Sequence, residues 1–153
     1  MKIRIVCAVV LLGGALTALA GPVEDTIRYR QSAFTFIGWN VSRIQQQVVE
    51  HPETYNKDQV AAAANAIAAV ANSGLGALFV PGTEKGTGWR PTELKAEFFQ
   101  KPDEARQAAT AFTQEANTFA KVVAQGDLGT IKTEFGKLRK TCKGCHDDFR
   151  SRD

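Results

Sequence analysis

The chain has 153 residues, of which 44% are hydrophobic and 23% are charged, and its formal net charge is +3. This length suits one domain with a substantial core and is too short for two. Nucleic-acid binding requires a clustered basic face, and the near balance of 19 basic and 16 acidic residues argues against such a partner.

The first 20 residues have the pattern of a secretory signal peptide. A basic start at Lys2 and Arg4 precedes an apolar run that ends in the small-x-small tripeptide Ala18-Leu19-Ala20. The run is short for a transmembrane helix. We therefore expect residues 1–20 to be removed, and residues 21–153 to form one exported domain without a membrane anchor.

Helical periodicity fills the rest of the chain, and no alternating strand pattern occurs. Apolar residues recur at steps of three and four in four segments, which predicts four amphipathic helices. These segments are residues 23–50, 57–73, 102–125 and 128–150. Pro52 ends the first helix, Pro102 opens the third, and Asp127 is a natural N-cap for the fourth.

A long connection joins the second helix to the third. Short helical pieces are predicted at residues 75–79 and 92–100, and the prolines and glycines of residues 80–91 predict an irregular loop between them. Four helices with facing apolar stripes form an antiparallel up-down four-helix bundle, so the predicted fold class is all-α.

The last helix carries the motif Cys142-Lys143-Gly144-Cys145-His146. Cys-x-x-Cys-His is the pattern for covalent attachment of a c-type haem. Each thiol can add to a vinyl group on the same porphyrin edge, and His146 can bind the iron. Cys142 and Cys145 continue the apolar stripe of the helix, so we expect one covalently bound haem c inside the bundle.

Two other uses of the cysteine pair are weaker. A structural zinc site needs two further Cys or His ligands, and the only other histidine is His51. A redox dithiol is expected in a βαβ context, which the helical pattern does not provide.

The mature chain has no methionine, because the only methionine is Met1. Many electron-carrying c haems use Met and His as their two axial ligands, and that arrangement is excluded here. His51 lies beside Pro52 at the far end of the first helix, so we do not expect it to bind iron.

Four blocks of sequence are typical of one haem-protein family. They are Tyr29-Arg30-Gln31-Ser32-Ala33, Pro81-Gly82-Thr83-Glu84, Arg90-Pro91, and residues 141–150 around the haem motif. With them the chain resembles the class II cytochromes c, and within these the cytochromes c′, over essentially its whole mature length. The resemblance implies a periplasmic, usually homodimeric protein with a five-coordinate, mostly high-spin haem that binds NO and CO.

The resemblance also implies roles for single residues. His146 would be the axial ligand of the haem iron. Phe34 occupies the position where cytochromes c′ place an apolar side chain over the distal face of the iron, and would act as a steric gate. Arg150 corresponds to a basic residue near the proximal histidine. On pattern alone, Phe34 would be a core residue and Arg150 a solvated charge at a helix end.

Further cofactor contacts are expected around Arg30, which interrupts the apolar stripe of the first helix. An unpaired guanidinium is costly to bury, and a haem propionate would be a suitable partner. The alternative is an open bundle end with a solvated Arg30. Gln31 could donate to the same propionate, and Gly88 and Trp89 in the loop are candidate haem contacts.

Two functions remain, and they do not exclude each other. One is the binding of NO and CO at an apolar distal site. The other is electron transfer with an unidentified periplasmic redox partner, as in carriers of the cytochrome c-556 type, which use a methionine from the first helix. The missing methionine and the bulky Phe34 favour gas binding.

A third class of function, a haem-free interaction bundle, would require unmodified cysteines. We expect no enzyme activity, because no inward carboxylate pair and no nucleophile with a spare histidine is predicted.

Overall fold

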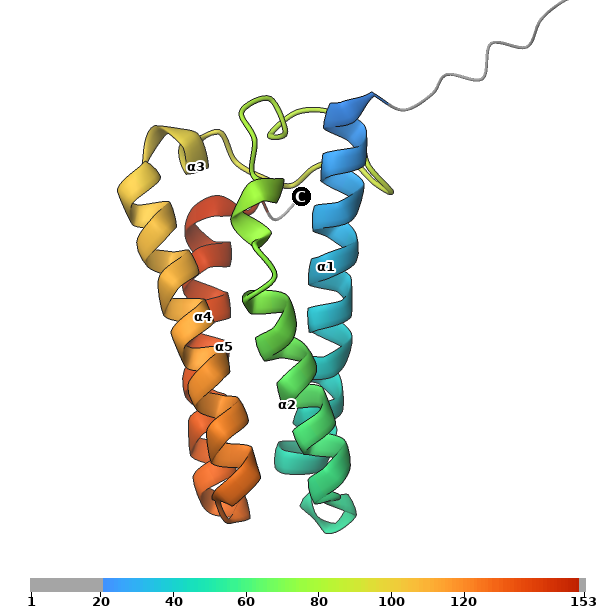
Figure 1. Cartoon of the computed structure of the whole chain (residues 1–153), viewed down its shortest axis with the longest axis vertical. Helices are drawn as coiled ribbons and strands as arrows, with labels where there is room; N and C mark the ends of the chain where they lie inside the picture. The colour runs from blue at the N-terminus through green and yellow to red at the C-terminus, as the bar shows by residue number, and fades with distance from the viewer. Residues whose placement is uncertain (1–20, 152–153) are drawn as a thin grey trace, which may run out of the picture.

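A computed structural model describes residues 21–151, and the predicted signal peptide lies outside that range. Four long helices form an up-down bundle in which neighbours run antiparallel (Figure 1). They are α1 (Pro22–Gln45), α2 (Lys57–Ala71), α4 (Pro102–Gln125) and α5 (Leu128–Phe149). Residues 21–151 contain no strand, so the all-α bundle is confirmed. Within this range no helix combines the length and the apolar character that crossing a membrane requires.

The local sequence explains where the helices begin. Pro22 and Pro102 stand at the first positions of α1 and α4, where a missing N–H costs nothing, and acidic residues follow each of them. Asn56 and Asp127 cap α2 and α5. In both caps the side-chain oxygen accepts a hydrogen bond of 3.0 Å from the backbone N–H three residues further on.

The connections differ from the prediction at one place. After α1 come a π-helical turn, Gln46–Glu50, and a 3-10 turn, Pro52–Thr54, while a 3-10 turn at Leu75–Leu78 follows α2. The short helix α3 spans only Glu97–Gln100, whereas residues 92–100 were predicted to be helical.

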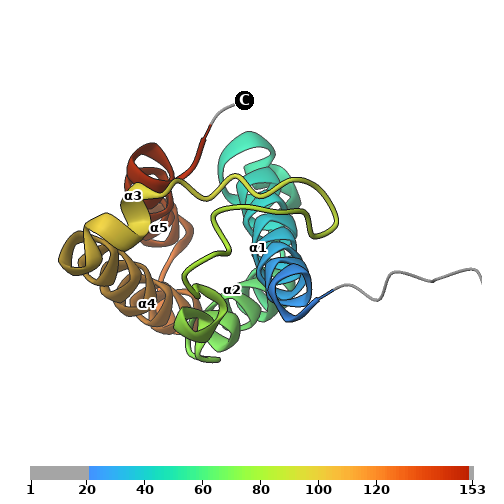
Figure 2. The same ribbon diagram turned by 90° about the horizontal axis from the view of Figure 1, so that it is seen from above.

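Helix α3 is short because the residues before it pair with the end of α5. The backbone N–H of Lys95 donates to the carbonyl of Phe149 at 2.9 Å, and that of Ser151 donates to Glu93 at 2.8 Å. In Figure 2 the long connection passes across one end of the bundle. It therefore covers the end at which α5 carries the haem motif.

The two halves of the bundle are packed differently. The half with the short turns, lower in Figure 1, is filled by fully buried side chains from all four long helices and from the π-helical turn. They include Ile44, Val48, Val60, Ile67, Phe119, Val123, Ile131, Phe135 and Leu138. The half under the long connection contains a cavity instead. The dense half holds the helices in place, and the cavity half is the candidate site.

Two polar positions in the bundle differ from the predicted pattern. On α1 the structure buries Asn40 among the apolar side chains, and its Nδ2 donates to the carbonyl of Phe36 at 2.9 Å. Between α4 and α5 it buries Glu134 against Glu115. The prediction that no carboxylate pair points inward is therefore corrected. The pair lies outside the cavity wall.

Candidate functional site

A cavity of about 510 Å³ lies between α1, the end of α2, α4 and α5. Most of its wall is apolar, which is typical of a ligand or cofactor site. The larger apolar side chains on it are Phe34, Ile37, Val41, Phe79, Phe98, Phe112 and Phe149. A polar group gathers where the long connection meets α1 and α5, and comprises Arg30, Gln31, Arg90, Thr92, Glu93 and Arg150.

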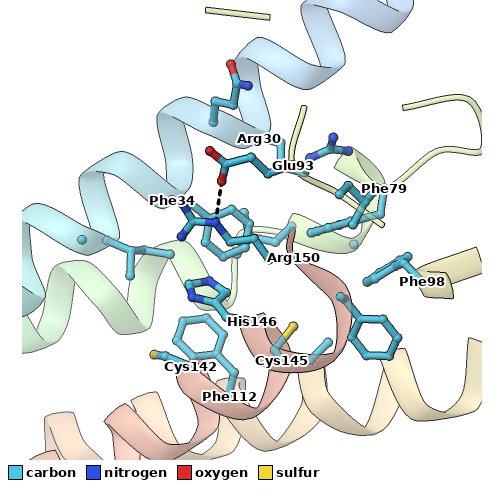
Figure 3. Close-up of a pocket in the computed structure, with 18 of the residues that line it drawn as sticks. Arg30, Phe34, Phe79, Glu93, Phe98, Phe112, Cys142, Cys145, His146 and Arg150 are labelled. Carbon is cyan, nitrogen blue, oxygen red and sulfur yellow. Dashed lines mark hydrogen bonds and ion pairs between the residues drawn. The ribbon is translucent and has the colours of Figure 1, made fainter. Parts of the chain in front are cut away.

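All three functional side chains of the haem motif line this cavity. Cys142, Cys145 and His146 come from the last two turns of α5 (Figure 3). The spacing of three residues brings both thiols to one face of the helix, and both are half-buried and free of disulfide bonds. Burial raises the pKa of the Cys142 and Cys145 thiols, so both are neutral at pH 7.

The environment of His146 favours its neutral form. Burial lowers the pKa of the imidazole, and the positive charge of Arg150 lowers it further, while Asp147 and Glu93 oppose this shift. A neutral imidazole is the form that binds a metal. His51, by contrast, is exposed at the other end of α1 and pairs with Glu53 at 3.2 Å, far from the cavity wall.

The donor set on the wall fits a covalently attached haem. Two thiols and a neutral imidazole face an apolar space, and a porphyrin needs that combination of attachment points, axial ligand and apolar surroundings. Over residues 21–151, no group of three or more His, Cys, Asp or Glu side chains could hold a metal ion by itself. The structural zinc alternative therefore lacks ligands.

Arg150 lies on the cavity wall with His146, and its Nε donates to Oε2 of Glu93 (Figure 3). Arg90 contributes a second contact to that carboxylate, at 3.4 Å. These contacts lower the pKa of Glu93, chiefly through the hydrogen bond from Arg150. Glu93 was not predicted as a site residue, because it lies in an irregular segment where no periodicity indicates the direction of a side chain.

Phe34 reaches the cavity from α1, whereas His146 reaches it from α5 (Figure 3). The Phe34 side chain remains 36% exposed, unlike Ile37 at 5% on the same stripe. Its ring meets the edge of Phe79, with centroids 6.2 Å apart. Phe34 is therefore part of the cavity wall and not of the packed core.

Arg30 is buried, with 6% of its surface exposed, so the predicted alternative of a solvated Arg30 is wrong. Its Nη1 donates to the carbonyl of Leu78 at 2.8 Å and to Oγ1 of Thr83 at 2.7 Å. Its Nη2 donates to the carbonyl of Thr83 at 2.7 Å and to Oγ1 of Thr92 at 3.0 Å. Neutral oxygens of the long connection thus satisfy the guanidinium. The propionate contact stays a prediction.

Gln31, Gly88 and Trp89 fasten the long connection to α1. Oε1 of Gln31 accepts from the backbone N–H of Trp89 at 2.7 Å, and its Nε2 donates to the carbonyl of Arg90 at 2.9 Å. At Gly88 a Cβ would come within 2.9 Å of the backbone of α1, which only glycine avoids. Gln31 lines the cavity, but Gly88 and the 72% exposed Trp89 do not. The structure thus gives Gly88 and Trp89 a role in this attachment, and their contact with haem stays a prediction.

The fold and the site together define a c-type haem protein built as a four-helix bundle, with its attachment motif on the last helix. The family model described as Cytochrome C' matches residues 25–150, and the chain belongs to the cytochrome c′ family. The family binds haem c covalently, which confirms the predicted cofactor.

Known proteins resemble the chain over nearly its whole described length. The cytochrome c′ of Rhodocyclus tenuis is 50% identical over 130 residues, which cover 85% of this chain and 96% of that protein. The structure of a cytochrome c′ with an unusual ligand-controlled dimer dissociation has a TM-score of 0.80 at 42% identity, covering 88% of this chain and 100% of that one. The nitric oxide complex of a cytochrome c prime variant from Alcaligenes xylosoxidans has a TM-score of 0.73 at 28% identity, covering 85% and 97%.

Proposed function

We propose that this protein binds the small neutral gases NO and CO at a five-coordinate haem iron in the periplasm. The observation that carries the proposal is the composition of the cavity wall. Apart from His146, no histidine, methionine, lysine or tyrosine lines it, and methionine is absent from residues 2–153. The wall therefore offers none of the side chains that commonly complete an axial pair on a c haem.

Residues on α5 would hold the haem, and a residue on α1 would control access to its other face. On α5, Cys142 and Cys145 would hold the porphyrin, and the neutral imidazole of His146 would bind the iron. On α1, Phe34 offers a ring without a hydrogen-bond donor, which disfavours water and anions more than neutral diatomic molecules. When bound, haem supplies an iron that can take up a gas molecule or exchange one electron.

A solved relative supports the binding of a gas. A cytochrome c prime variant has been obtained as its nitric oxide complex, and it shares this fold and 28% of its residues. The predicted signal peptide supports export, and the largely apolar wall supports the binding of small neutral ligands.

The second candidate is an electron carrier with a periplasmic redox partner. It does not require an open axial position, and the apolar lining near Phe34 gives it no specific support. The two functions differ in what happens when CO is added to the reduced protein, because a six-coordinate carrier would have no free position.

A homodimer forms part of the proposal. On α1 the side chains of Phe36 and Trp39 are 47% and 54% exposed and stack with ring centroids 5.9 Å apart. The guanidinium of Arg43 lies 4.7 Å from the centre of the Trp39 ring. Aromatic residues and arginine are typical of interface hot spots, and one solved relative is described as a dimer that a ligand dissociates.

Optical spectra of the holoprotein, oxidised and reduced, with and without CO or NO, test the main proposal. We expect a high-spin spectrum that changes when either gas is added to the reduced protein. A low-spin spectrum that CO leaves unchanged would favour the electron carrier and would reject the open-site function.

A further inference from the structure

The long connection holds the end of α5 directly after the predicted axial ligand. An antiparallel bridge joins Leu94 to Arg150. Nζ of Lys95 donates to the carbonyls of Asp147 and Asp148, at 3.0 and 3.2 Å. These contacts satisfy carbonyls that the end of a helix leaves without partners. The last turn of α5 is therefore fixed to the connection by backbone atoms and by one ammonium group.

Arg150 is the first residue after α5, and its backbone is extended, with φ −116° and ψ 130°. Its N–H still donates to the carbonyl of His146, at 3.1 Å. Because Arg150 lies outside the helical period, the helix does not set the direction of its side chain. Holding a long arginine side chain in one place costs conformational entropy, so the position of the guanidinium depends on a partner.

That partner is the carboxylate of Glu93. Its Oε2 accepts from Nε of Arg150, and its Oε1 lies 3.4 Å from Nε of Arg90. The side chains of Arg150 and Glu93 are 46% and 29% exposed, and an ion pair with this exposure contributes little to stability. The main consequence of the contact is therefore where it places the charge of Arg150.

Both charges of this ion pair reach the imidazole of His146. Burial lowers the pKa of His146 most, the charge of Arg150 lowers it further, and the charge of Glu93 raises it by a smaller amount than Arg150 lowers it. Arg150 therefore acts on the imidazole more strongly than the carboxylate that holds it.

We propose that Glu93 is a positioning residue for the histidine side of the haem: its carboxylate holds the guanidinium of Arg150 beside His146, and the charge held there raises the reduction potential of the iron. A positive charge beside the iron ligand favours ferrous over ferric iron, which carries one more positive charge. This inference rests on the part of the proposed function in which His146 binds the iron. It adds a residue of the long connection to that side of the site.

Two substitutions at one position separate the charge of Glu93 from its hold on Arg150. Glu93→Gln and Glu93→Leu remove the same negative charge, but only glutamine keeps an oxygen that can accept from the guanidinium. Glu93→Gln should raise the reduction potential of the holoprotein, because a negative charge is lost and Arg150 stays in place. In Glu93→Leu the guanidinium turns to solvent, and the loss of its stronger effect should bring the potential below that of wild type.

Spectroelectrochemical titration measures the difference. At one fixed electrode potential, the ratio of reduced to oxidised haem should be about fivefold lower in Glu93→Leu than in Glu93→Gln, as expected when a unit charge leaves a half-buried site. Crystal structures should show the Arg150 guanidinium beside His146 in Glu93→Gln and turned to solvent in Glu93→Leu. Equal potentials in these two variants, or a guanidinium that keeps its place in Glu93→Leu, would overturn the inference.

Two controls complete the test. In an Arg150→Gln background, Glu93→Gln and Glu93→Leu should give equal potentials, since no guanidinium is left to hold. Glu97→Gln changes an exposed carboxylate on α3 that does not line the cavity, and it should leave the potential near that of wild type. A difference between the two variants that persists in the Arg150→Gln background would also contradict the inference.

The CO spectra of wild type separate this inference from the proposed function. If CO binds to the reduced protein but the two variants at Glu93 share one potential, only the inference about Glu93 fails. If wild type is low-spin and CO leaves its spectrum unchanged while the two variants differ as expected, the open-site function fails and the inference stands.

Discussion

Arg30 and Phe34 lie one turn apart on α1 and both line the cavity, but their surroundings give them different tasks. The guanidinium of Arg30 donates to three residues of the long connection. The Phe34 ring has no polar group and lies on the apolar part of the cavity wall beside Phe79. A buried, fully bonded side chain stabilises the fold, whereas an apolar ring on the cavity wall can respond when a ligand enters. We therefore place the ligand response at Phe34.

Phe34→Ala should speed CO association with the reduced holoprotein about tenfold or more, because no ring has to be displaced before the gas reaches the iron. Flash photolysis measures this rate. Phe36→Ala is a matched control, since Phe36 is an exposed phenylalanine on the same helix that does not line the cavity. Equal rates in Phe34→Ala and wild type would remove Phe34 from the ligand path.

The sequence predicted those site residues that lie on regular helices. The motif residues and Phe34 follow a period that fixes the direction of each side chain. Phe79, Phe98 and Glu93 were missed, because they lie in the connection or in one short turn, where spacing says nothing about direction. They also depend on contacts between segments far apart in the sequence.

At the scale of elements, the long connection is held at three places. Arg30 binds it from inside the bundle, Gln31 binds it at the surface of α1, and the end of α5 pairs with Glu93 and Lys95. Thr83, although in an irregular loop, is completely buried beside Arg30. The connection is thus a built part of the cavity wall, which its content of glycine and proline alone does not predict.

Arg30→Met should lower the free energy of unfolding by about 4 kcal/mol, since four hydrogen bonds of roughly 1 kcal/mol each are lost and buried oxygens lose their donors. Chemical denaturation of the holoprotein measures the change. Arg106→Met on α4 removes only an exposed ion pair with Asp103 and should cost about 0.5 kcal/mol. Similar losses in the two variants would show that the connection does not depend on Arg30.

Two carboxyl groups, one on α4 and one on α5, form a contact between these helices. Oε2 of Glu134 accepts from Nζ of Lys137 at 2.7 Å, and Glu115 bonds to Glu134 from the facing helix. Burial raises the pKa of Glu115, and the bond to Glu134 and its charge raise it further, while Lys137 opposes the shift. The hydrogen bond from Lys137 lowers the pKa of Glu134. Of the two carboxyl groups, Glu115 is therefore the one that keeps its proton to the higher pH.

This pair predicts a pH dependence of stability. A raised pKa in the folded state means that the stabilisation is fully present below the ordinary pKa of glutamate and is lost as pH rises through the raised pKa. Glu115→Gln keeps a donor toward Glu134 without a titrating proton. It should exceed wild type in free energy of unfolding by on the order of 1 kcal/mol at pH 8, and this advantage should disappear near pH 4.

Denaturation at a series of pH values measures that difference. Glu104→Gln, at an exposed position near the start of α4, is the control and should show no comparable change with pH. An advantage of Glu115→Gln that stays constant from pH 4 to pH 8 would mean that folding does not raise the pKa of Glu115.

At the scale of the whole molecule, the bundle was predictable because each long helix carries its own periodic stripe and its own start signal. The division into a dense half and a cavity half was not. It depends on which stripe positions meet across four helices. Ile67 and Phe119 are fully buried, yet Phe112, on the same face of α4 as Phe119, borders the cavity.

The proposed homodimer can be tested on the aromatic face of α1. If Phe36 and Trp39 lie at the centre of a two-fold interface, each contributes about 2 kcal/mol, which corresponds to a roughly 30-fold weaker association when one is removed. The double variant Phe36→Ser/Trp39→Ser should therefore be monomeric in sedimentation experiments at concentrations where wild type is a dimer.

The control is Val80→Ser, at a position 46% exposed in the long connection, and this variant should remain dimeric. Neither Phe36 nor Trp39 lines the cavity, so the haem spectrum of the monomeric variant should match that of wild type. A double variant that stays dimeric would place the interface elsewhere on the bundle.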